Sequence, residues 1–318
     1  MLNFLALQEN QFINQHEDTK DVVWICAEQP TKEEIDYLIS TYQLPHDYVT
    51  GILDDDENSR FEGLHQNSLE EPALLLLQYP VKSLSPSGYN QLNTYPLALI
   101  MTTNNKVISV ANHPADFIQK AMNSQYDLSK EHLQEEIVVH LAWFLSLSYN
   151  DYLKTLGEKT DSLESELQVT TQNKQLYQVM DFQKSLVYFE AALKANRDVL
   201  GALYKARVFE NSQQHLPRLH DVIVETRQAL TTTQIQMQIV DKISETFSAI
   251  VSNNLNNVMK ILTSLTIVLT IPTIIGGVFG MNVKLPFANR EDAFWWIFIL
   301  TTILCVLAIR TLKKKNLL

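Results

Sequence analysis

The C-terminal part of the chain contains two long stretches without a charged residue. The first, residues 261–283, has 23 residues, and the second, residues 293–309, has 17. About 20 consecutive apolar residues are enough to cross a bilayer. The second stretch is short, but Arg310 and the lysines after it extend it because their long side chains reach the membrane surface. Trp295 and Trp296 at its start suit the opposite interface. We therefore predict two membrane-spanning helices rather than two buried core helices.

A long amphipathic pattern leads into the first span. From Pro217 to Thr270 the chain has no further proline and no glycine, and its apolar residues recur at steps of three and four. If this helix continues to Phe279 it has about 63 residues and a length of about 95 Å. Pro272 lies inside the span, where it removes one helix hydrogen bond. Helices of this length are typical of coiled coils, bundles and membrane proteins.

Polar residues inside the first span also follow a helical spacing. They form one stripe on one face: Asn256, Thr263, Thr266, Thr270, Thr273, Gly277 and Gly280. In one interpretation the threonines bond the carbonyls four residues earlier, and the small residues allow helices to approach closely. In the other, the stripe lines water. A single chain with two spans cannot enclose a pore, so the second interpretation requires several copies around an axis.

The remaining chain predicts an α+β domain with a small sheet and mostly helical structure. Strands are expected over residues 21–28, 73–81 and 97–111, and long helices in the middle of the chain. The predicted organisation is an N-terminal cytoplasmic α/β domain (1–130), a cytoplasmic long-helix region (131–257), a first, pore-lining span (258–282), an outer loop (283–292), a second span (293–312) and a basic cytoplasmic tail (313–318).

Charge separates the two parts of the chain. The net charge is -11, yet residues 257–318 carry seven Lys or Arg and only two acidic residues, so the remainder is at -16. An acidic body argues against nucleic acid as a partner, because binding phosphate requires a basic face. Basic residues concentrate after the second span, which by the positive-inside rule places the tail in the cytoplasm. With two spans, the N-terminal region is cytoplasmic too, and the loop between the spans faces outward.

The sequence carries no pattern typical of an enzyme or of a cofactor site. Its two cysteines, Cys26 and Cys305, lie far apart in apolar segments, which fits a reducing compartment. We find no Walker A motif, no HExxH, no cluster of Cys and His, and no cleavable signal peptide at the start. We therefore expect a protein of the cell membrane that is not an enzyme and has no cofactor.

The end of the first span resembles the signature of the CorA family of divalent-cation transporters. In that family the first of two C-terminal spans ends in Gly-Met-Asn after an aromatic residue; here these are Phe279, Gly280, Met281 and Asn282. The segment 44–63 is similar to the family's helix, acidic turn and arginine. Residues 98–121 resemble its strand hairpin and following helix, and residues 149–200 its pair of middle helices.

The resemblance implies a homopentameric funnel in the lipid bilayer, with a cytoplasmic α+β domain, a very long pore helix and an outer second helix. It implies ion selection at Gly280, Met281 and Asn282, and a cytoplasmic regulatory metal site that includes Asp221. Its acidic partner is not placed, with residues 54–57 as candidates. The pore-lining positions that it implies are Asn256, Met259, Leu262, Thr266, Thr270 and Thr273.

The function implied is passive, voltage-driven entry of Mg2+ through a pentameric pore, with Co2+ and Ni2+ as further candidates. Mg2+ is then both the transported ion and the regulatory ion, which acts from inside the cell. Two alternatives stay open. One is a Zn2+ transporter of the ZntB type, with coupling to protons. The other is a membrane-anchored sensor that does not conduct.

Overall fold

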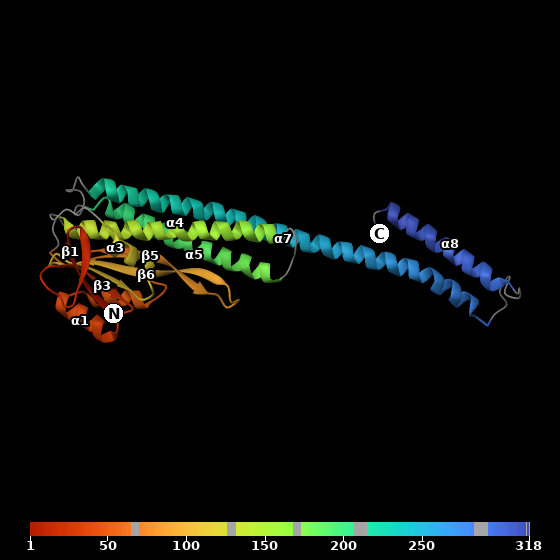
Figure 1. The fold of residues 1–318 in the computed structure, drawn as a ribbon, viewed down its shortest axis with the longest axis horizontal. Helices are drawn as coiled ribbons and strands as arrows, with labels where there is room; N and C mark the ends of the chain where they lie inside the picture. Colours follow the sequence, from red (N-terminus) through yellow and green to blue (C-terminus); the bar gives the residue numbers. More distant parts are fainter. Residues whose placement is uncertain are drawn as a thin grey trace. The chain divides into compact units, whose positions relative to one another are not determined.

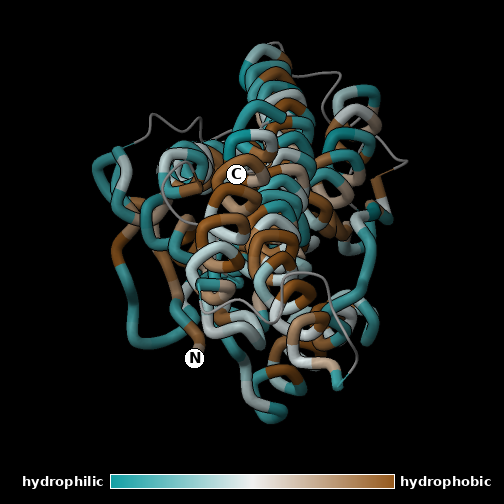
Figure 2. Tube along the Cα trace, turned by 90° about the vertical axis from the view of Figure 1, so that its right-hand side faces the viewer, coloured by the Kyte–Doolittle hydropathy of each residue, from teal (hydrophilic) through white to brown (hydrophobic). Residues whose placement is uncertain are grey.

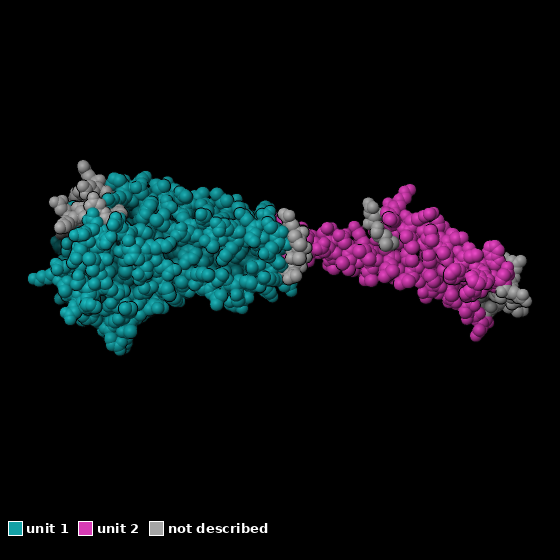
Figure 3. Space-filling view, viewed as in Figure 1, with its two compact units in different colours: residues 1–244 teal, residues 245–318 magenta. Residues whose placement is uncertain are grey.

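The computed structural model describes residues 1–64, 70–125, 132–167, 173–206, 215–282, 292–315 and 317. The chain forms two compact units, unit 1 over Met1–Ser244 and unit 2 over Glu245–Leu318 (Figure 3). One helix, α7 (His215–Phe279), contributes residues to both units. The outer loop expected over 283–292 lies, apart from its last residue, outside the described residues.

Unit 1 contains a seven-stranded sheet in the order β2-β1-β3-β7-β6-β5-β4. The pairing of β3 with β7 is parallel, and the other five pairings are antiparallel. Glu9 and Asn10 have left-handed φ angles of 47° and 63°, as a two-residue hairpin turn between β1 and β2 requires. The strands are β1 (Leu2–Gln8), β2 (Gln11–Gln15), β3 (Val22–Glu28), β4 (Arg60–Glu62), β5 (Ala73–Leu84), β6 (Asn90–Met101) and β7 (Val107–Ala111).

Helices cover both faces of this sheet (Figure 1). One face carries α1 (Lys32–Tyr42), α2 (His46–Thr50) and the short 3-10 helix η1 (Gly51–Leu53). The other face carries α3 (Asp116–Asn123), α4 (Leu133–Leu167) and α5 (Asn173–Leu203). Thr31 caps α1: its hydroxyl accepts from the Glu34 amide, and the Glu34 carboxylate accepts from the Thr31 amide.

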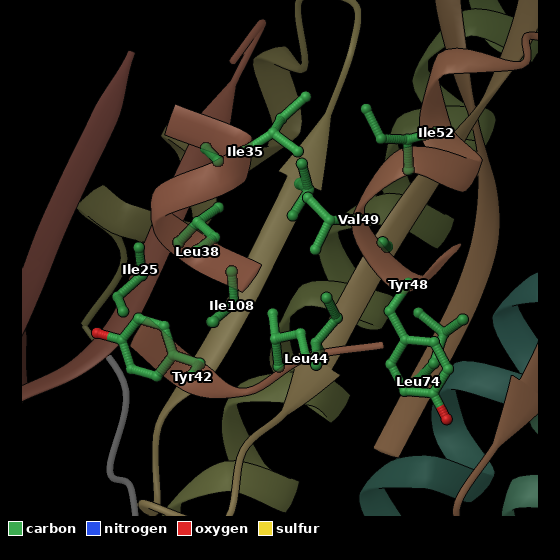
Figure 4. Packing of buried hydrophobic residues seen from close by; sticks show 14 of the residues in the cluster. Ile25, Ile35, Leu38, Tyr42, Leu44, Tyr48, Val49, Ile52, Leu74 and Ile108 are labelled. Atoms are coloured by element: carbon green, nitrogen blue, oxygen red, sulfur yellow. The ribbon is translucent and has the colours of Figure 1, made fainter. Parts of the chain in front are cut away.

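The core between α1, α2 and the sheet is closely packed (Figure 4). Leu38 from α1 and Val49 from α2 are fully buried against Ile25, Leu74 and Ile108 from the strands. Burial of a side chain of this size stabilises the fold by about 1.5–3 kcal/mol. This core defines one side of unit 1.

A buried asparagine joins α5 to the other side of the sheet. The short strand β4 pairs with β5 only over Leu74–Leu76. Gln78 on β5 therefore lies beyond the part of β5 that β4 covers. The Asn196 amide takes the place of a strand there. Its Oδ1 accepts from the Gln78 amide at 2.8 Å and from the Ser59 hydroxyl at 2.9 Å, and its Nδ2 donates to the Gln78 carbonyl at 2.7 Å. Tyr149 on α4 donates to the same carbonyl at 3.0 Å.

The structure confirms the α+β class and the three expected strand regions, but the sheet is larger than predicted. The first 15 residues form the β1–β2 hairpin, which the sequence analysis did not assign. Strands β5 and β6 run for 12 residues each, through Pro80 and Pro96. Proline weakens the signal for a strand because it has no amide to donate.

Unit 2 consists of the C-terminal part of α7 and α8 (Ala293–Lys314). The predicted long helix is confirmed: α7 has 65 residues, with Pro272 inside it. The most apolar windows of α7 and α8 have a mean hydropathy of 2.0 and 2.1, yet only 6% and 0% of them is buried. A core helix of a soluble protein would be covered, so these are two membrane-spanning helices. In Figure 2, which colours the chain by hydropathy, brown apolar and teal polar segments alternate along the helices.

Candidate functional site

The polar stripe of the first span lies on an open face of α7. We use this name for Asn256, Thr263, Thr266, Thr270, Thr273, Gly277 and Gly280, and all seven are exposed. Met259 and Leu262, which were expected beside them, are 52% and 55% exposed. One continuous helix therefore presents every predicted pore-lining position on one uncovered side.

The helix α8 packs against the opposite side of α7. Between residues 251 and 282 four side chains of α7 are partly or fully covered: Ser264, Val268, Ile271 and Ile275. At about 100° per residue, their direction differs from that of the polar stripe by roughly half a turn. The matching positions on α8 are Ala293, Ile297, Thr301, Cys305, Ala308 and Leu312. Packing with α8 thus leaves the polar stripe free.

Two polar contacts fix this pairing of helices. The Ser264 hydroxyl, 1% exposed as a residue, donates to the Leu317 carbonyl at 2.6 Å. The Cys305 Sγ lies 3.8 Å from the Val268 carbonyl. Pro272 stands four residues after Val268, so it cannot supply the amide that normally bonds that carbonyl. The pairing therefore covers a backbone acceptor that lipid could not satisfy.

Three threonine hydroxyls of the stripe use their hydrogens within the helix. Thr266, Thr270 and Thr273 donate to the carbonyls four residues earlier at 2.8, 2.6 and 2.9 Å. The first of the two interpretations of the stripe is confirmed in this respect. A hydroxyl oxygen that has donated its hydrogen still has lone pairs to accept with. Thr266, Thr270 and Thr273 consequently present acceptor oxygens to whatever lies beside the stripe.

The Gly-Met-Asn motif begins where α7 ends. The helix ends at Phe279, although the Gly280 amide still donates to the Gly276 carbonyl at 2.9 Å. A Cβ at Gly280 would lie 3.1 Å from that carbonyl oxygen, which is a tight contact. Met281 and Asn282 follow as exposed, non-helical residues. The three residues predicted for ion selection therefore stand at the end of the polar stripe.

The predicted regulatory residue, Asp221, lies on α7 within unit 1. It is exposed and lines a small cavity of about 130 Å³ with Val139, Trp143, Arg218 and Val222. Arg218 in turn pairs with the buried Glu136 at 3.2 Å. Within the described part of the chain, no three His, Cys, Asp or Glu residues come together as a metal site. Among these residues Asp221 therefore stands as a single carboxylate rather than as part of a ligand cluster.

The acidic turn proposed as its partner has contacts of its own. Asp55 lies 2.8 Å from His113 Nε2, and Glu57 pairs with Arg60. Arg60 also pairs with Glu62 at 2.7 Å. These contacts tie the turn to unit 1, and the structure does not bring it near a ligand set.

Sequence reasoning missed an extension of the polar stripe toward the N-terminus. Glu245, Ser248 and Ser252 are exposed and continue the spacing back from Asn256 by steps of four, four and three. They therefore lie on the same face of α7. The same periodicity that identified the stripe would have found them.

Comparison with known proteins identifies the same architecture. The family described as CorA-like Mg2+ transporter protein matches residues 19–314. The curated Cobalt/magnesium transport protein CorA of Methanocaldococcus jannaschii is 24% identical over 181 residues, which cover 57% of this chain and 57% of that protein. The chain spans about half the length of the curated relatives it matches.

Solved structures share the fold. The complete structure of the CorA magnesium transporter from Methanocaldococcus jannaschii has a TM-score of 0.79 at 20% identity, and the match covers 98% of this chain and 97% of that one. The ZntB cytoplasmic domain from Vibrio parahaemolyticus has a TM-score of 0.58 at 13% identity, covering 79% of this chain and 98% of that domain. At these identities the likeness concerns the fold alone.

Proposed function

The chain belongs to the family of CorA-like Mg2+ transporter proteins, and from that premise we propose that it conducts hydrated divalent cations, Mg2+ first among them, across a membrane. The observation that carries this proposal is the polar stripe. It occupies the face of α7 opposite to α8 and ends at the Gly-Met-Asn motif. A stripe of small and polar residues has little use against lipid, but it suits a water-filled path.

The path requires several copies of the chain, and we propose a homopentamer. One α7 cannot enclose water, so the stripes of neighbouring copies face a common axis. Apolar side chains flank the stripe on both sides and give neighbouring copies of α7 a surface on which to pack. Four of them, between 44% and 59% exposed in the single chain, are Leu265, Ile267, Leu269 and Ile274.

The chemistry of the stripe fits a cation that keeps its water. Mg2+ is small and hard and dehydrates reluctantly. Its coordinated waters are strong hydrogen-bond donors, and the amide oxygen of Asn282 and the hydroxyl oxygens of Thr270 and Thr273 are acceptors. A ring of such neutral oxygens recognises the hydrated ion without the tight binding of a carboxylate cage. The carbonyl of Gly280 adds a further acceptor at the entrance.

The membrane potential supplies the driving force. We place both termini in the cytoplasm, because the basic residues after α8 favour the inner side. A charge gains about 2.3 kcal/mol for each 100 mV, and a divalent ion about twice that. Inward transport of Mg2+ therefore needs no nucleotide.

Control by internal Mg2+ is the regulatory part of the proposal. Asp221 is exposed, and the described residues bring no complete ligand set to it. A cation bound between copies at Asp221 would offset the repulsion of the acidic units and hold the ring closed. Loss of internal Mg2+ would release it. Asp221→Lys should therefore reduce the protection from proteolysis that Mg2+ gives, and unchanged protection would contradict the assignment.

The decisive experiment is flux into proteoliposomes with an inside-negative potential, with Mg2+ and Zn2+ compared in the presence and absence of a proton gradient. We expect Mg2+ entry driven by voltage alone. Asn282→Ala should abolish it, while the matched control Asn254→Ala, on an exposed face of α7 away from the stripe, should not. Entry of Mg2+ into Asn282→Ala vesicles that contain folded protein would refute the selectivity ring.

A Zn2+ transporter is the second candidate, because the cytoplasmic fold is shared with a ZntB domain. Zn2+ entry that depends on a proton gradient would support it in the same experiment. Absence of flux for both ions would instead favour the sensor that does not conduct.

A further inference from the structure

The face of α8 that points away from α7 changes its chemistry along its length. The residues about half a turn from the α7-facing side form what we call the outer face. All of them are exposed: Trp295, Trp296, Ile299, Ile303, Val306, Leu307, Arg310, Lys313 and Lys314. The outer face thus begins with two tryptophans, continues with four aliphatic residues and ends with three cations.

The three cations converge within about one helical turn. Lys313 and Lys314 follow Arg310 by three and four positions, so both side chains are neighbours of Arg310 on the helix surface. Like charges at this spacing destabilise a helix unless an anion lies between them. Within the described residues 293–315 there is no acidic side chain. The nearest described acid in the sequence, Asp292, accepts a bond of 2.9 Å from Trp296 Nε1 at the opposite end.

The end of α8 is held so that these cations stay on the outer face. Leu312, 8% exposed, points toward α7. Beyond the helix, the Leu317 amide donates to the Leu312 carbonyl at 3.1 Å. The Leu317 carbonyl accepts from Ser264 on α7 at 2.6 Å. The helix end is therefore fixed at two points, and Arg310, Lys313 and Lys314 cannot rotate toward α7.

We propose that the outer face binds one anionic phospholipid from the leaflet at this end of the hairpin. The headgroup phosphate bridges Arg310, Lys313 and Lys314, since a guanidinium fork fits phosphate oxygens and lysine adds point charges. An acyl chain lies along Ile303, Val306 and Leu307. The continuous apolar surface beside the cations selects a lipid over a soluble phosphate. This site does not depend on which ion the protein conducts, or on whether it conducts.

The test places a fluorescent reporter beside the site. Leu307→Trp is introduced into a Trp295→Phe/Trp296→Phe background, and the full-length protein is reconstituted into vesicles with equal amounts of phosphatidylglycerol and phosphatidylcholine. One lipid at a time carries bromine, which quenches tryptophan on contact. We expect phosphatidylglycerol to be preferred at least about fivefold, the ratio that corresponds to the ~1 kcal/mol of one basic residue at an anionic surface.

Variants separate a defined site from general surface charge. In the triple variant Arg310→Gln/Lys313→Gln/Lys314→Gln, the preference for phosphatidylglycerol should fall close to unity. In the control Lys260→Gln/Lys315→Gln, which removes two other cations at the same end of the helix pair, it should persist. Arg310→Gln alone leaves two lysines to maintain the orientation, and should lose most of the preference. Ser264→Ala should weaken it, because it releases the helix end.

Three results would overturn the proposal. The first is an unchanged preference in both Arg310→Gln and the triple variant. The second is an equal loss in the Lys260→Gln/Lys315→Gln control, which would indicate surface potential only. The third is full displacement by excess inorganic phosphate, which would identify a soluble anion as the occupant.

Discussion

The Sγ of Cys305 lies 3.8 Å from the carbonyl oxygen of Val268, the acceptor that Pro272 leaves without its helix amide. A proline inside a span removes one hydrogen bond, and the second helix covers the acceptor left behind. A thiol is a weak donor, so the contact is modest in energy. It nevertheless gives Cys305, an isolated cysteine in an apolar helix, a structural role as a donor to the Val268 carbonyl. It also explains how the kink-prone position is tolerated inside a membrane.

This relationship predicts a coupling between two substitutions. Cys305→Ala should lower the thermal stability of the detergent-purified protein by about 0.5–1 kcal/mol, since it exposes the unpaired carbonyl. In a Pro272→Ala background, where an amide returns to Val268, the same change should cost nothing measurable. A double-mutant cycle of melting curves measures the coupling. Equal costs in both backgrounds would show that the thiol only fills space.

If the hydroxyl oxygens of the stripe accept hydrogen bonds from the ion's water shell, removing one of them should reduce transport, whereas removing a similar hydroxyl from α8 should not. Thr270→Val keeps the shape of the side chain and removes one acceptor per copy, so Mg2+ flux should fall about tenfold, as expected for one lost hydrogen bond to an ion's water shell. Thr302→Val is the control. Thr302 makes the same kind of bond within its helix, to the Phe298 carbonyl at 2.8 Å, but it lies on α8. Equal effects of the two variants would show that the helix rather than the path was damaged.

The sheet of unit 1 should depend on Asn196. Asn196→Ala leaves the Gln78 amide without its acceptor in a buried position and removes two further bonds. The free energy of unfolding should fall by about 2–3 kcal/mol. Chemical denaturation followed by circular dichroism gives the value. The control Asn14→Ala, on an exposed edge strand, should change it by less than about 0.5 kcal/mol.

Buried His140 predicts a pH dependence of stability. Burial lowers the pKa of His140 below its usual value; a bond to the Ala121 carbonyl opposes the shift, and the nearby charge of Arg218 adds to it. The unfolded chain therefore binds the proton more readily than the folded one. As the pH falls below about 6.5, the ordinary pKa of histidine, stability is lost until the lower pKa of the folded state is reached.

The measurement is denaturation of the detergent-purified protein over that pH range. In His140→Gln the loss should be smaller, because the titrating group is gone. His46→Gln, at an exposed histidine, serves as the control. If His140→Gln and the unmodified protein lose stability in parallel, other groups account for the pH dependence.

The membrane helices could be predicted from sequence because their signals are local. An uncharged stretch, a pair of tryptophans at the membrane interface and a lysine cluster each follow from the cost of placing polar groups in hydrocarbon. The stripe on α7 is equally local, since a spacing of three and four residues fixes its face. The long helix follows from the absence of proline and glycine between Pro217 and Pro272, and it ends at Phe279, shortly after two glycines.

The features of the fold that could not be predicted from the sequence depend on contacts between residues far apart in the chain. The strand β4 has only three residues and is defined by its pairing with β5. The edge strand β2, with the sequence QFINQ, has too few apolar residues to mark a strand by itself. The bond between Asn196 and Gln78 joins positions 118 residues apart. The links of Cys305 to Val268 and of Leu317 to Ser264 also required the arrangement of two helices. The spacing of residues within one segment does not predict such contacts between segments.

The polar stripe also determines a handedness. From Asn256 to Gly280 its positions repeat by sevens, with members at steps of three and four. A straight α-helix has 3.6 residues per turn, so a strict repeat of 3.5 drifts by about 20° per heptad. Copies that keep the stripe toward one axis must wind around each other as a left-handed superhelix. A change in the pitch of this superhelix changes the diameter of the enclosed space along the whole length of the bundle at once. In the proposed pore, the pitch of the bundle, rather than the rotamer of any single side chain, would set the width available to a hydrated ion.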